Sequence, residues 1–183
     1  IINGLTDYCH PCQVLADLMT IREHYGSLKD LKMAYIGDGN NMANSLIVGA
    51  LKSGMKMACA SPEGYRPDEK VLAFAGEYGD RFQLTTDPAE AVRDAAVVVT
   101  DTSASMGQED EKEERKKAFA GYQVNSELMK NAREGAMVLH CLPAYREQEI
   151  TEEVFEQHAD EIFEEAENRL HAQKAVMVTL MKD

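Results

Sequence analysis

The sequence contains no tryptophan, and its 19 lysines and arginines are outnumbered by 32 aspartates and glutamates. It also lacks an apolar run long enough to cross a bilayer. The net charge of -13 opposes binding to phosphate backbones and anionic lipid, because both carry negative charge. We therefore expect no nucleic-acid partner and no membrane partner, although a local cationic pocket for a small anion is compatible with this charge.

Cysteine is scarce, with four residues in a chain of 183. That number is too small for a disulfide scaffold, so we expect reduced thiols and a cytoplasmic protein. No signal peptide precedes the first expected element, and the chain starts at Ile1 without an initiator methionine, which suggests a processed or excised chain. Cys9 and Cys12 form a C-x-x-C in "YCHPCQ". This C-x-x-C has three alternative interpretations: a redox pair, half of a zinc site, or a motif that needs neither cysteine. No second cysteine pair completes a zinc site, and residues 1–8 are a poor first strand for a redox fold.

Apolar strands alternate with amphipathic helices along the whole chain. The pattern predicts strands at 32–37, 56–61, 82–86, 96–101 and 136–142. It predicts helices at 11–25, 41–53, 67–78, from 88, at 110–120, 126–133, 151–158 and 166–181. Such alternation is typical of a doubly wound, Rossmann-like α/β domain of three layers, here with a five-stranded parallel sheet. We expect one domain over 1–183, with a leading helix in 1–30, an α/β core in 31–146 and C-terminal helices in 147–183.

Ligands of such folds bind at the carboxyl ends of the strands, which directs attention to the loops after Ile36, Val99 and Leu139. The first loop, "GDGNN", resembles the start of a dinucleotide fingerprint but lacks its third glycine and the acidic residue after the second strand. Its alternative interpretation is a tight turn with a polar helix start. The second loop, "DTSASMGQE", places Asp101 where it can bind an ammonium group; an ordinary βα loop is the alternative.

The third loop, "HCLPAYR", follows the last strand and carries Cys141, which can be catalytic or a buried small hydrophobe. Adjacent strand residues point to opposite faces, so His140 and Cys141 are not expected to form an acid–base pair. In "CHPCQ", Pro11 fits the first helical position, with His10 as the cap and Gln13 in the first turn. We expect the charged run 109–117 to be a solvated helix face and Arg169 to lie in the first turn of the last helix.

The segments H-P-C-Q, D-G-N-N, D-x-x-x-S-M-G-Q-E, H-C-L-P and E-N-R-L-H-A-Q-K-A occur in this order over nearly the whole chain. Together they resemble the ornithine carbamoyltransferases, and the S-M-G loop resembles the ornithine enzymes more than their aspartate, putrescine or acetylornithine relatives. The resemblance implies the transfer of a carbamoyl group from carbamoyl phosphate to L-ornithine, giving citrulline and phosphate in arginine biosynthesis. It implies no metal or organic cofactor, and a homo-oligomer, since the family is trimeric.

The resemblance also implies a role for each matching residue. The ornithine-binding positions are Asn41, Asp101, Ser105 and Met106; the carbamoyl-phosphate positions are His10, Gln13, Cys141, Leu142 and Arg169; Asp101 and Cys141 are the catalytic pair.

The sequence departs from the family in having no S-x-R-T phosphate cradle, and Ser103 stands where tryptophan is usual. We therefore expect the ornithine-binding half of such an enzyme, without its carbamoyl-phosphate domain and inactive alone. Two alternatives remain. One is a truncated or engineered scaffold that self-assembles through the apolar segment 175–181 of the last helix. The other is a nicotinamide or redox enzyme, which rests on two incomplete motifs.

Overall fold

A parallel sheet forms the centre of the computed structural model, which describes residues 1–102 and 112–182. Its strands are β1 (Lys32–Ile36), β2 (Lys56–Ala60), β3 (Phe82–Thr85), β4 (Val97–Thr100) and β5 (Met137–His140). They lie in the order β3-β2-β1-β4-β5, and every neighbouring pair is parallel. This confirms the predicted five-stranded parallel sheet. The order reverses between β1 and β4, so the loops after these two strands meet at the switch point.

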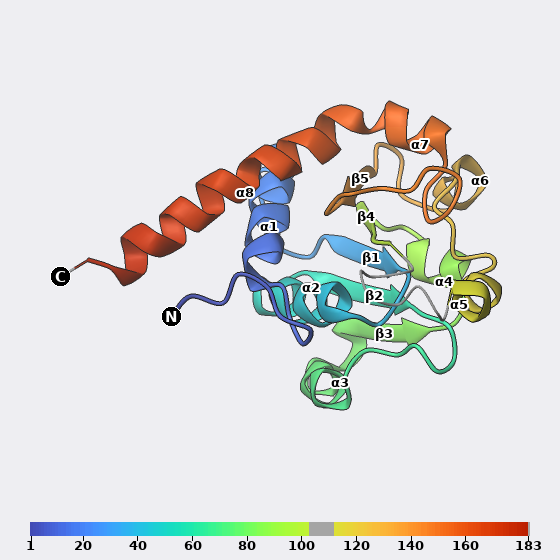
Figure 1. Cartoon of the computed structure of the whole chain (residues 1–183), viewed down its shortest axis with the longest axis horizontal. Coiled ribbons are helices and arrows are strands. Elements are labelled where there is room, and N and C mark those ends of the chain that lie inside the picture. Colours follow the sequence, from blue (N-terminus) through green and yellow to red (C-terminus); the bar gives the residue numbers. More distant parts are fainter. Residues whose placement is uncertain (103–111, 183) are drawn as a thin grey trace.

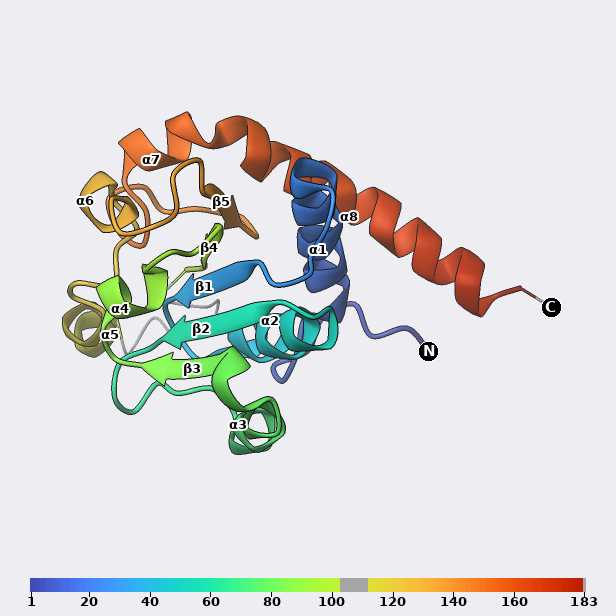
Figure 2. The same ribbon diagram turned by 180° about the vertical axis from the view of Figure 1, so that it is seen from behind.

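Helices cover both faces of this sheet, as Figures 1 and 2 show. The helices are α1 (Pro11–Tyr25), α2 (Asn41–Lys52), α3 (Glu69–Gly76), α4 (Pro88–Val92), α5 (Lys112–Ala118), α6 (Ser126–Met129), α7 (Glu152–Gln157) and α8 (Ala159–Leu180), with a short 3-10 turn at Gly79–Arg81. The confirmed fold class is therefore α/β with layers on either side of one sheet. In the described residues, no helix combines the length and apolarity that a membrane crossing requires.

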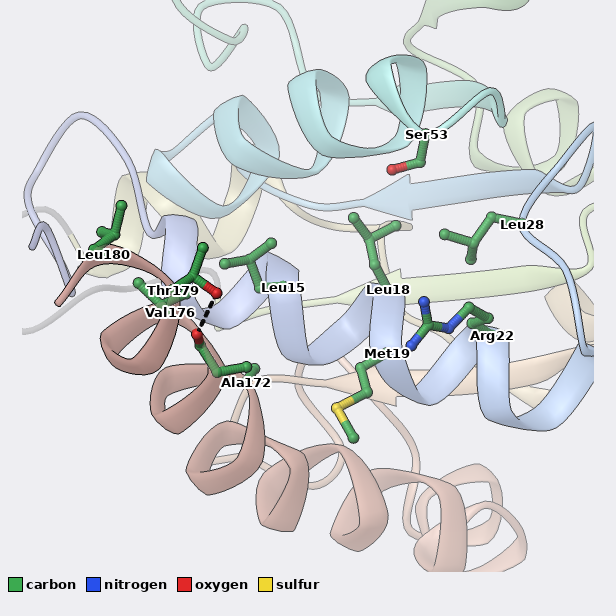
Figure 3. Close-up of a pocket in the computed structure, with 11 residues that line it drawn as sticks. Leu15, Leu18, Met19, Arg22, Leu28, Ser53, Ala172, Val176, Thr179 and Leu180 are labelled. Carbon is green, nitrogen blue, oxygen red and sulfur yellow. Dashed lines mark hydrogen bonds between the residues drawn. The ribbon is translucent and has the colours of Figure 1, made fainter. Parts of the chain in front are cut away.

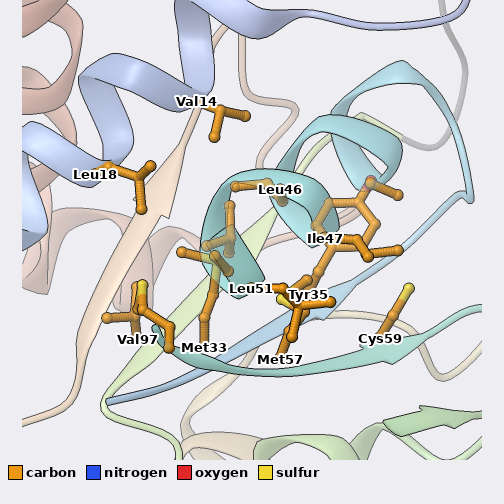
Figure 4. Close-up of a cluster of buried hydrophobic side chains, with 14 of the residues drawn as sticks. Val14, Leu18, Met33, Tyr35, Leu46, Ile47, Leu51, Met57, Cys59 and Val97 are labelled. Carbon is orange, nitrogen blue, oxygen red and sulfur yellow. The ribbon is translucent and has the colours of Figure 1, made fainter. Parts of the chain in front are cut away.

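Two apolar clusters hold these layers together because alternate strand residues face opposite sides of the sheet. On one face, Met33 and Tyr35 of β1 pack against α1 and α2, as the close-up in Figure 4 shows. On the other face, Ala34 and Ile36 pack with residues of α4, α7 and the start of α8. All four of these β1 side chains are fully buried. Both faces of the central strand are thus dry, which explains its continuous apolar sequence.

The start of α1 follows the sequence prediction in position but not in every contact. Pro11 is the first helical residue and His10 occupies the cap position, as expected. The His10 side chain makes no cap hydrogen bond; its Nδ1 lies 2.8 Å from the carbonyl oxygen of Gly4 instead. The imidazole is therefore bonded to the N-terminal segment.

At its other end, α1 is followed by Gly26, whose φ of 77° lies in the left-handed region and closes the last turn.

Two expectations about charged segments were wrong. The run 109–117 is not simply a solvated face, because Arg115 of α5 is 4% exposed and pairs with the carboxylate of Asp38. The last helix begins at Ala159 rather than near 166, so Arg169 lies well inside it. Glu161 and Glu165, on successive turns, accept hydrogen bonds from backbone N–H groups of β5 and so hold this earlier part of α8 against the sheet.

Candidate functional site

Asp101 lies at the switch point, directly after β4, and is the centre of a compact polar cluster. Its Oδ1 accepts hydrogen bonds from the Cys141 thiol, at 3.1 Å, and from the backbone N–H of Thr102, at 2.7 Å. Its Oδ2 accepts from Asn40 Nδ2 at 2.9 Å. Loops that follow three different strands therefore meet on one carboxylate, as the Rossmann-like topology predicts.

Asn40 joins this cluster, although the sequence interpretation singled out its neighbour Asn41. The Asn40 Oδ1 accepts hydrogen bonds from the backbone N–H groups of Met42 and Ala43, so it caps α2 while its Nδ2 binds Asp101. Asn41 instead donates from Nδ2 to the carbonyl oxygen of Thr6 at 2.8 Å. The cap preference of asparagine was a signal that could have identified Asn40 from the sequence.

The glycines of "GDGNN" have a structural explanation. A Cβ on Gly39 would lie 2.1 Å from the carbonyl carbon of Arg66 and 2.2 Å from the nitrogen of Pro67. The Gly39 N–H donates to the carbonyl oxygen of Tyr65 at 2.8 Å. Backbone from the loop after β2 thus occupies the space that a pyrophosphate needs next to the second glycine of a dinucleotide fingerprint. This packing argues against the nicotinamide alternative.

Cys141 is held as a neutral thiol beside Asp101. Burial, followed by the adjacent carboxylate, raises the pKa of Cys141 well above its usual range. A thiol in this state donates a hydrogen bond and is a poor nucleophile. The arrangement therefore suits orientation of a ligand better than covalent catalysis.

His140 shapes the turn that carries Cys141 and Leu142. The Leu142 N–H donates to His140 Nδ1 at 3.0 Å, so Nε2 carries the hydrogen that faces Glu149 Oε1 at 3.1 Å. Leu142 has a φ of 53° and is joined to Pro143 by a cis peptide bond. His140 and Cys141 make separate contacts, as the alternation argument predicted. The imidazole contributes to the turn, while the thiol contributes to the Asp101 cluster.

Gln13 and Arg169 meet where α1 packs against α8. An Arg169 Nη1 donates to Gln13 Oε1, while Gln13 Nε2 donates to Asp17 Oδ1 at 2.9 Å and to Glu165 Oε1 at 2.8 Å. The family resemblance implied roles for both Gln13 and Arg169, whereas Asp17 and Glu165 were not predicted from the sequence. Single carboxyls on helices carry no signal of burial, and these two are 148 positions apart.

His10 is half-buried near the same helix start. Burial, and then the positive charge of Arg169, lower the pKa of His10 below its usual value. The neutral imidazole keeps one nitrogen on Gly4 and leaves the other for a further partner. Ser105 and Met106, both expected to bind ornithine, lie outside the residues that the structure describes.

The cysteines of "YCHPCQ" are both free thiols, as are Cys59 and Cys141. Cys9 accepts a hydrogen bond from Asn3 Nδ2 at 3.2 Å, and the Cys12 thiol donates to the Asn3 carbonyl oxygen at 3.4 Å. Within 1–102 and 112–182, no three histidine, cysteine or acidic side chains are grouped so that they can hold a metal ion. The Cys12 thiol instead joins α1 to the N-terminal segment, and the Cys9 bond lies within that segment.

Comparison with known proteins gives one consistent result. Residues 29–180 match the family model described as the aspartate/ornithine carbamoyltransferase Asp/Orn binding domain. The ornithine carbamoyltransferase of Carboxydothermus hydrogenoformans is 55% identical over 99% of this chain and 60% of its own length. The protein named anabolic ornithine carbamoyltransferase in Pyrococcus furiosus is 51% identical over 99% of this chain and 59% of its own length.

Solved structures agree with these sequence matches. The crystal structure of ornithine carbamoyltransferase from Gloeobacter violaceus superposes with a TM-score of 0.90, at 50% identity, over 99% of this chain and 62% of that one. The Pyrococcus furiosus enzyme gives a TM-score of 0.89 at 51% identity, over 96% of this chain and 57% of that one. This chain thus spans about 60% of the length of the curated relatives it matches. From the family match and the fold together, the chain belongs to the aspartate/ornithine carbamoyltransferase family and corresponds to its Asp/Orn binding domain.

Proposed function

We propose that this chain is the ornithine-binding part of an ornithine carbamoyltransferase, which converts carbamoyl phosphate and L-ornithine to citrulline and phosphate. The observation that carries the proposal is the hydrogen bond from the Cys141 thiol to Asp101 at the sheet's switch point. The relatives named ornithine carbamoyltransferase support the choice of substrate, and one of them is named anabolic, which favours arginine biosynthesis. The free cysteines favour a cytoplasmic enzyme.

Asp101 provides the negative charge for the side-chain amine of ornithine. In the reaction, the neutral form of this amine bonds to the carbamoyl carbon, the bond from that carbon to the phosphate oxygen breaks, and the nitrogen loses a proton that leaves with the phosphate. Asp101 and the neutral thiol of Cys141 orient the amine and assist that loss. Asn41, Ser105 and Met106 remain the proposed contacts to the rest of ornithine.

The carbamoyl group is proposed to bind at the start of α1. Gln13 is buried and its Oε1 accepts a hydrogen bond from Arg169; the second lone pair of this oxygen is the proposed acceptor for the NH2 of a carbamoyl group. His10 supplies a polar nitrogen nearby, and the carbonyl of Leu142 is proposed to complete the group. Arg169 is the cation for the phosphate, which leaves with the electrons of the broken bond.

Calorimetric titration with ornithine, alone and with carbamoyl phosphate, tests this proposal. We expect ornithine binding to weaken by about tenfold in Asp101→Asn, for the loss of one charge-assisted hydrogen bond. The exposed Asp80→Asn is the matched control and leaves the affinity unchanged. Unaltered ornithine binding in Asp101→Asn contradicts the assigned site. We expect no citrulline from this chain alone, because no S-x-R-T cradle is present in its sequence; substantial turnover contradicts that part.

A scaffold that self-assembles through α8 is the second candidate. The C-terminal half of α8 extends away from the body in Figure 1, and its Met177, Val178 and Leu180 are exposed. Between α8 and α1 lies an apolar pocket of about 580 Å³, with Leu15 and Leu18 on its α1 side, as Figure 3 shows. An uncovered apolar surface of this kind favours association.

Light scattering over a concentration series tests the second candidate. We expect oligomers that dissociate in Val178→Lys, whereas Leu5→Glu, a change of an exposed apolar residue outside α8, leaves them intact. A monomer at every concentration contradicts self-assembly without affecting the ornithine titration.

A further inference from the structure

Two carboxyl groups lie side by side in the dry interface between α1 and α8. Asp17 is fully buried and Glu165 is 1% exposed. Both accept a hydrogen bond from the same atom, Gln13 Nε2, at 2.9 and 2.8 Å. The second oxygen of Glu165 accepts from the backbone N–H of His140 at 2.9 Å. Of the four oxygens of the two carboxyls, only Asp17 Oδ2 has no hydrogen-bond partner among the described residues; the nearby Arg169 Nε also has none.

Two negative charges in this position are strongly disfavoured, because neither is solvated and each repels the other. Burial raises the pKa of Asp17 to about 6 and that of Glu165 well above its usual value. The neighbouring Asp17 carboxyl also raises the pKa of Glu165. A proton on Asp17 Oδ2 that points to Glu165 gives this oxygen its missing partner and removes one of the charges.

The surrounding groups fit one proton on the pair. Arg169 is the nearby cation and lies on the same helix as Glu165. The other titratable group facing the pair is the Cys141 thiol beyond β5, whose own pKa is raised. His140 contributes its backbone N–H, since its ring is bonded to Glu149. Two carboxyls with one proton carry a single negative charge, which the guanidinium balances, so the buried group is neutral as a whole.

The Gln13 amide lies between these charges and is held in one orientation. Its NH2 faces the two carboxyls and its oxygen faces Arg169; the opposite orientation would place oxygen against oxygen and NH2 against a cation. We propose that Asp17 and Glu165 share one proton and act as positioning residues that keep the Gln13 oxygen turned toward Arg169. The consequence for carbamoyl-phosphate binding rests on the function proposed above; the shared proton itself does not.

Two isosteric variants separate positioning from simple packing. Asp17→Asn imitates the protonated acid, because its NH2 can donate toward Glu165 while its oxygen still accepts from Gln13. Glu165→Gln has one oxygen for two donors, the Gln13 NH2 and the His140 N–H, so one donor must face an NH2 group. Glu167→Gln is the matched control, since the Glu167 side chain is 75% exposed on the same helix.

Infrared spectroscopy of the ligand-free chain at neutral pH tests the shared proton. We expect absorption from a buried protonated carboxyl in the wild type and in Glu167→Gln, and its loss in the double variant Asp17→Asn/Glu165→Gln, which has neither acid. Nuclear magnetic resonance of the Gln13 side-chain amide provides the second readout: its signals stay near their wild-type positions in Asp17→Asn and shift in Glu165→Gln. Absence of the protonated band in the wild type overturns the proposal, as does an amide that shifts equally in both variants.

Calorimetry with carbamoyl phosphate then measures the consequence. We expect affinity to fall by about tenfold in Glu165→Gln, to stay within about threefold in Asp17→Asn, and to be unchanged in Glu167→Gln. Equal losses in the two buried variants overturn the positioning role. If the wild-type chain fails to bind carbamoyl phosphate, the proposed function of this site fails, while the infrared and resonance data still decide whether the pair shares a proton.

Discussion

The buried pair makes folding stability depend on pH in a direction opposite to ordinary acid denaturation. Asp17 has a pKa of 3.8 when unfolded and about 6 when folded, owing mainly to burial. Between these values the folded state binds more protons than the unfolded state, so the free energy of unfolding falls as pH rises. The difference corresponds to ~3 kcal/mol, at 1.36 kcal/mol for each pKa unit. Ionisation of Glu165, whose pKa is also raised, extends the loss to higher pH.

Urea unfolding followed by circular dichroism at intervals from pH 4 to pH 7 measures this effect. Because other carboxylates contribute the usual acid destabilisation, the informative quantity is the free energy of unfolding of wild type minus that of Asp17→Asn. We expect this difference to fall by about 2 kcal/mol between pH 4 and pH 7, most of it by pH 6, because part of the total is already lost at pH 4. The exposed Asp160→Asn serves as control, with a nearly constant difference. A difference for Asp17→Asn that is flat or rises with pH refutes the reasoning.

Three further predictions concern packing and thiol chemistry. Gly39→Ala should destabilise the chain by about 3 kcal/mol in urea unfolding, because its Cβ would lie 2.1 Å from the carbonyl carbon of Arg66. The control Gly76→Ala has open space around the new Cβ and should be neutral or slightly stabilising. Arg115→Met should cost about 3–5 kcal/mol in the same assay, since it leaves a buried carboxylate without its cation; a cost below 1 kcal/mol is inconsistent with a buried ion pair. Cys9 and Cys141 are both partly buried, but Cys141 should be alkylated by iodoacetamide more slowly because its raised pKa keeps it protonated. Mass spectrometry of peptides measures the two rates, and equal rates would contradict the raised pKa of Cys141.

The sequence predicted the sheet and most helix starts because these depend on local patterns. Runs of apolar residues marked all five strands, and Asp87 followed by Pro88 marked the start of α4, where Asp87 accepts from the Ala89 N–H. The switch-point argument also led to Asp101 and Cys141, which the structure places in contact. Strand periodicity and parallel topology predicted that these two residues follow neighbouring strands, whereas their catalytic role was implied by the family resemblance.

The remaining features depend on partners that are distant in the sequence. Arg115 is buried because Asp38, 77 positions earlier, lies beside it, and charge patterning alone assigned it to solvent. Glu165 belongs to the sheet side of α8 because a β5 amide donates to it, and the helix that carries it begins at Ala159. Neither contact leaves a periodic signal, so the sequence could not identify the buried polar network.

The contacts of Asn40 connect Asp101 to backbone amides at the start of α2, where hydrogen exchange can be measured. The Asn40 Oδ1 accepts hydrogen bonds from the first amides of α2, and its Nδ2 donates to Asp101. The same side chain therefore stabilises both the helix start and the position of the carboxylate. If a bound ligand draws Asp101 away from Asn40, we expect the hydrogen bonds from the Met42 and Ala43 amides to weaken, which amide hydrogen exchange measures. Ligand binding at Asp101 should therefore be detectable as a change in the exchange rates of the Met42 and Ala43 amide hydrogens, even if the ligand contacts neither amide.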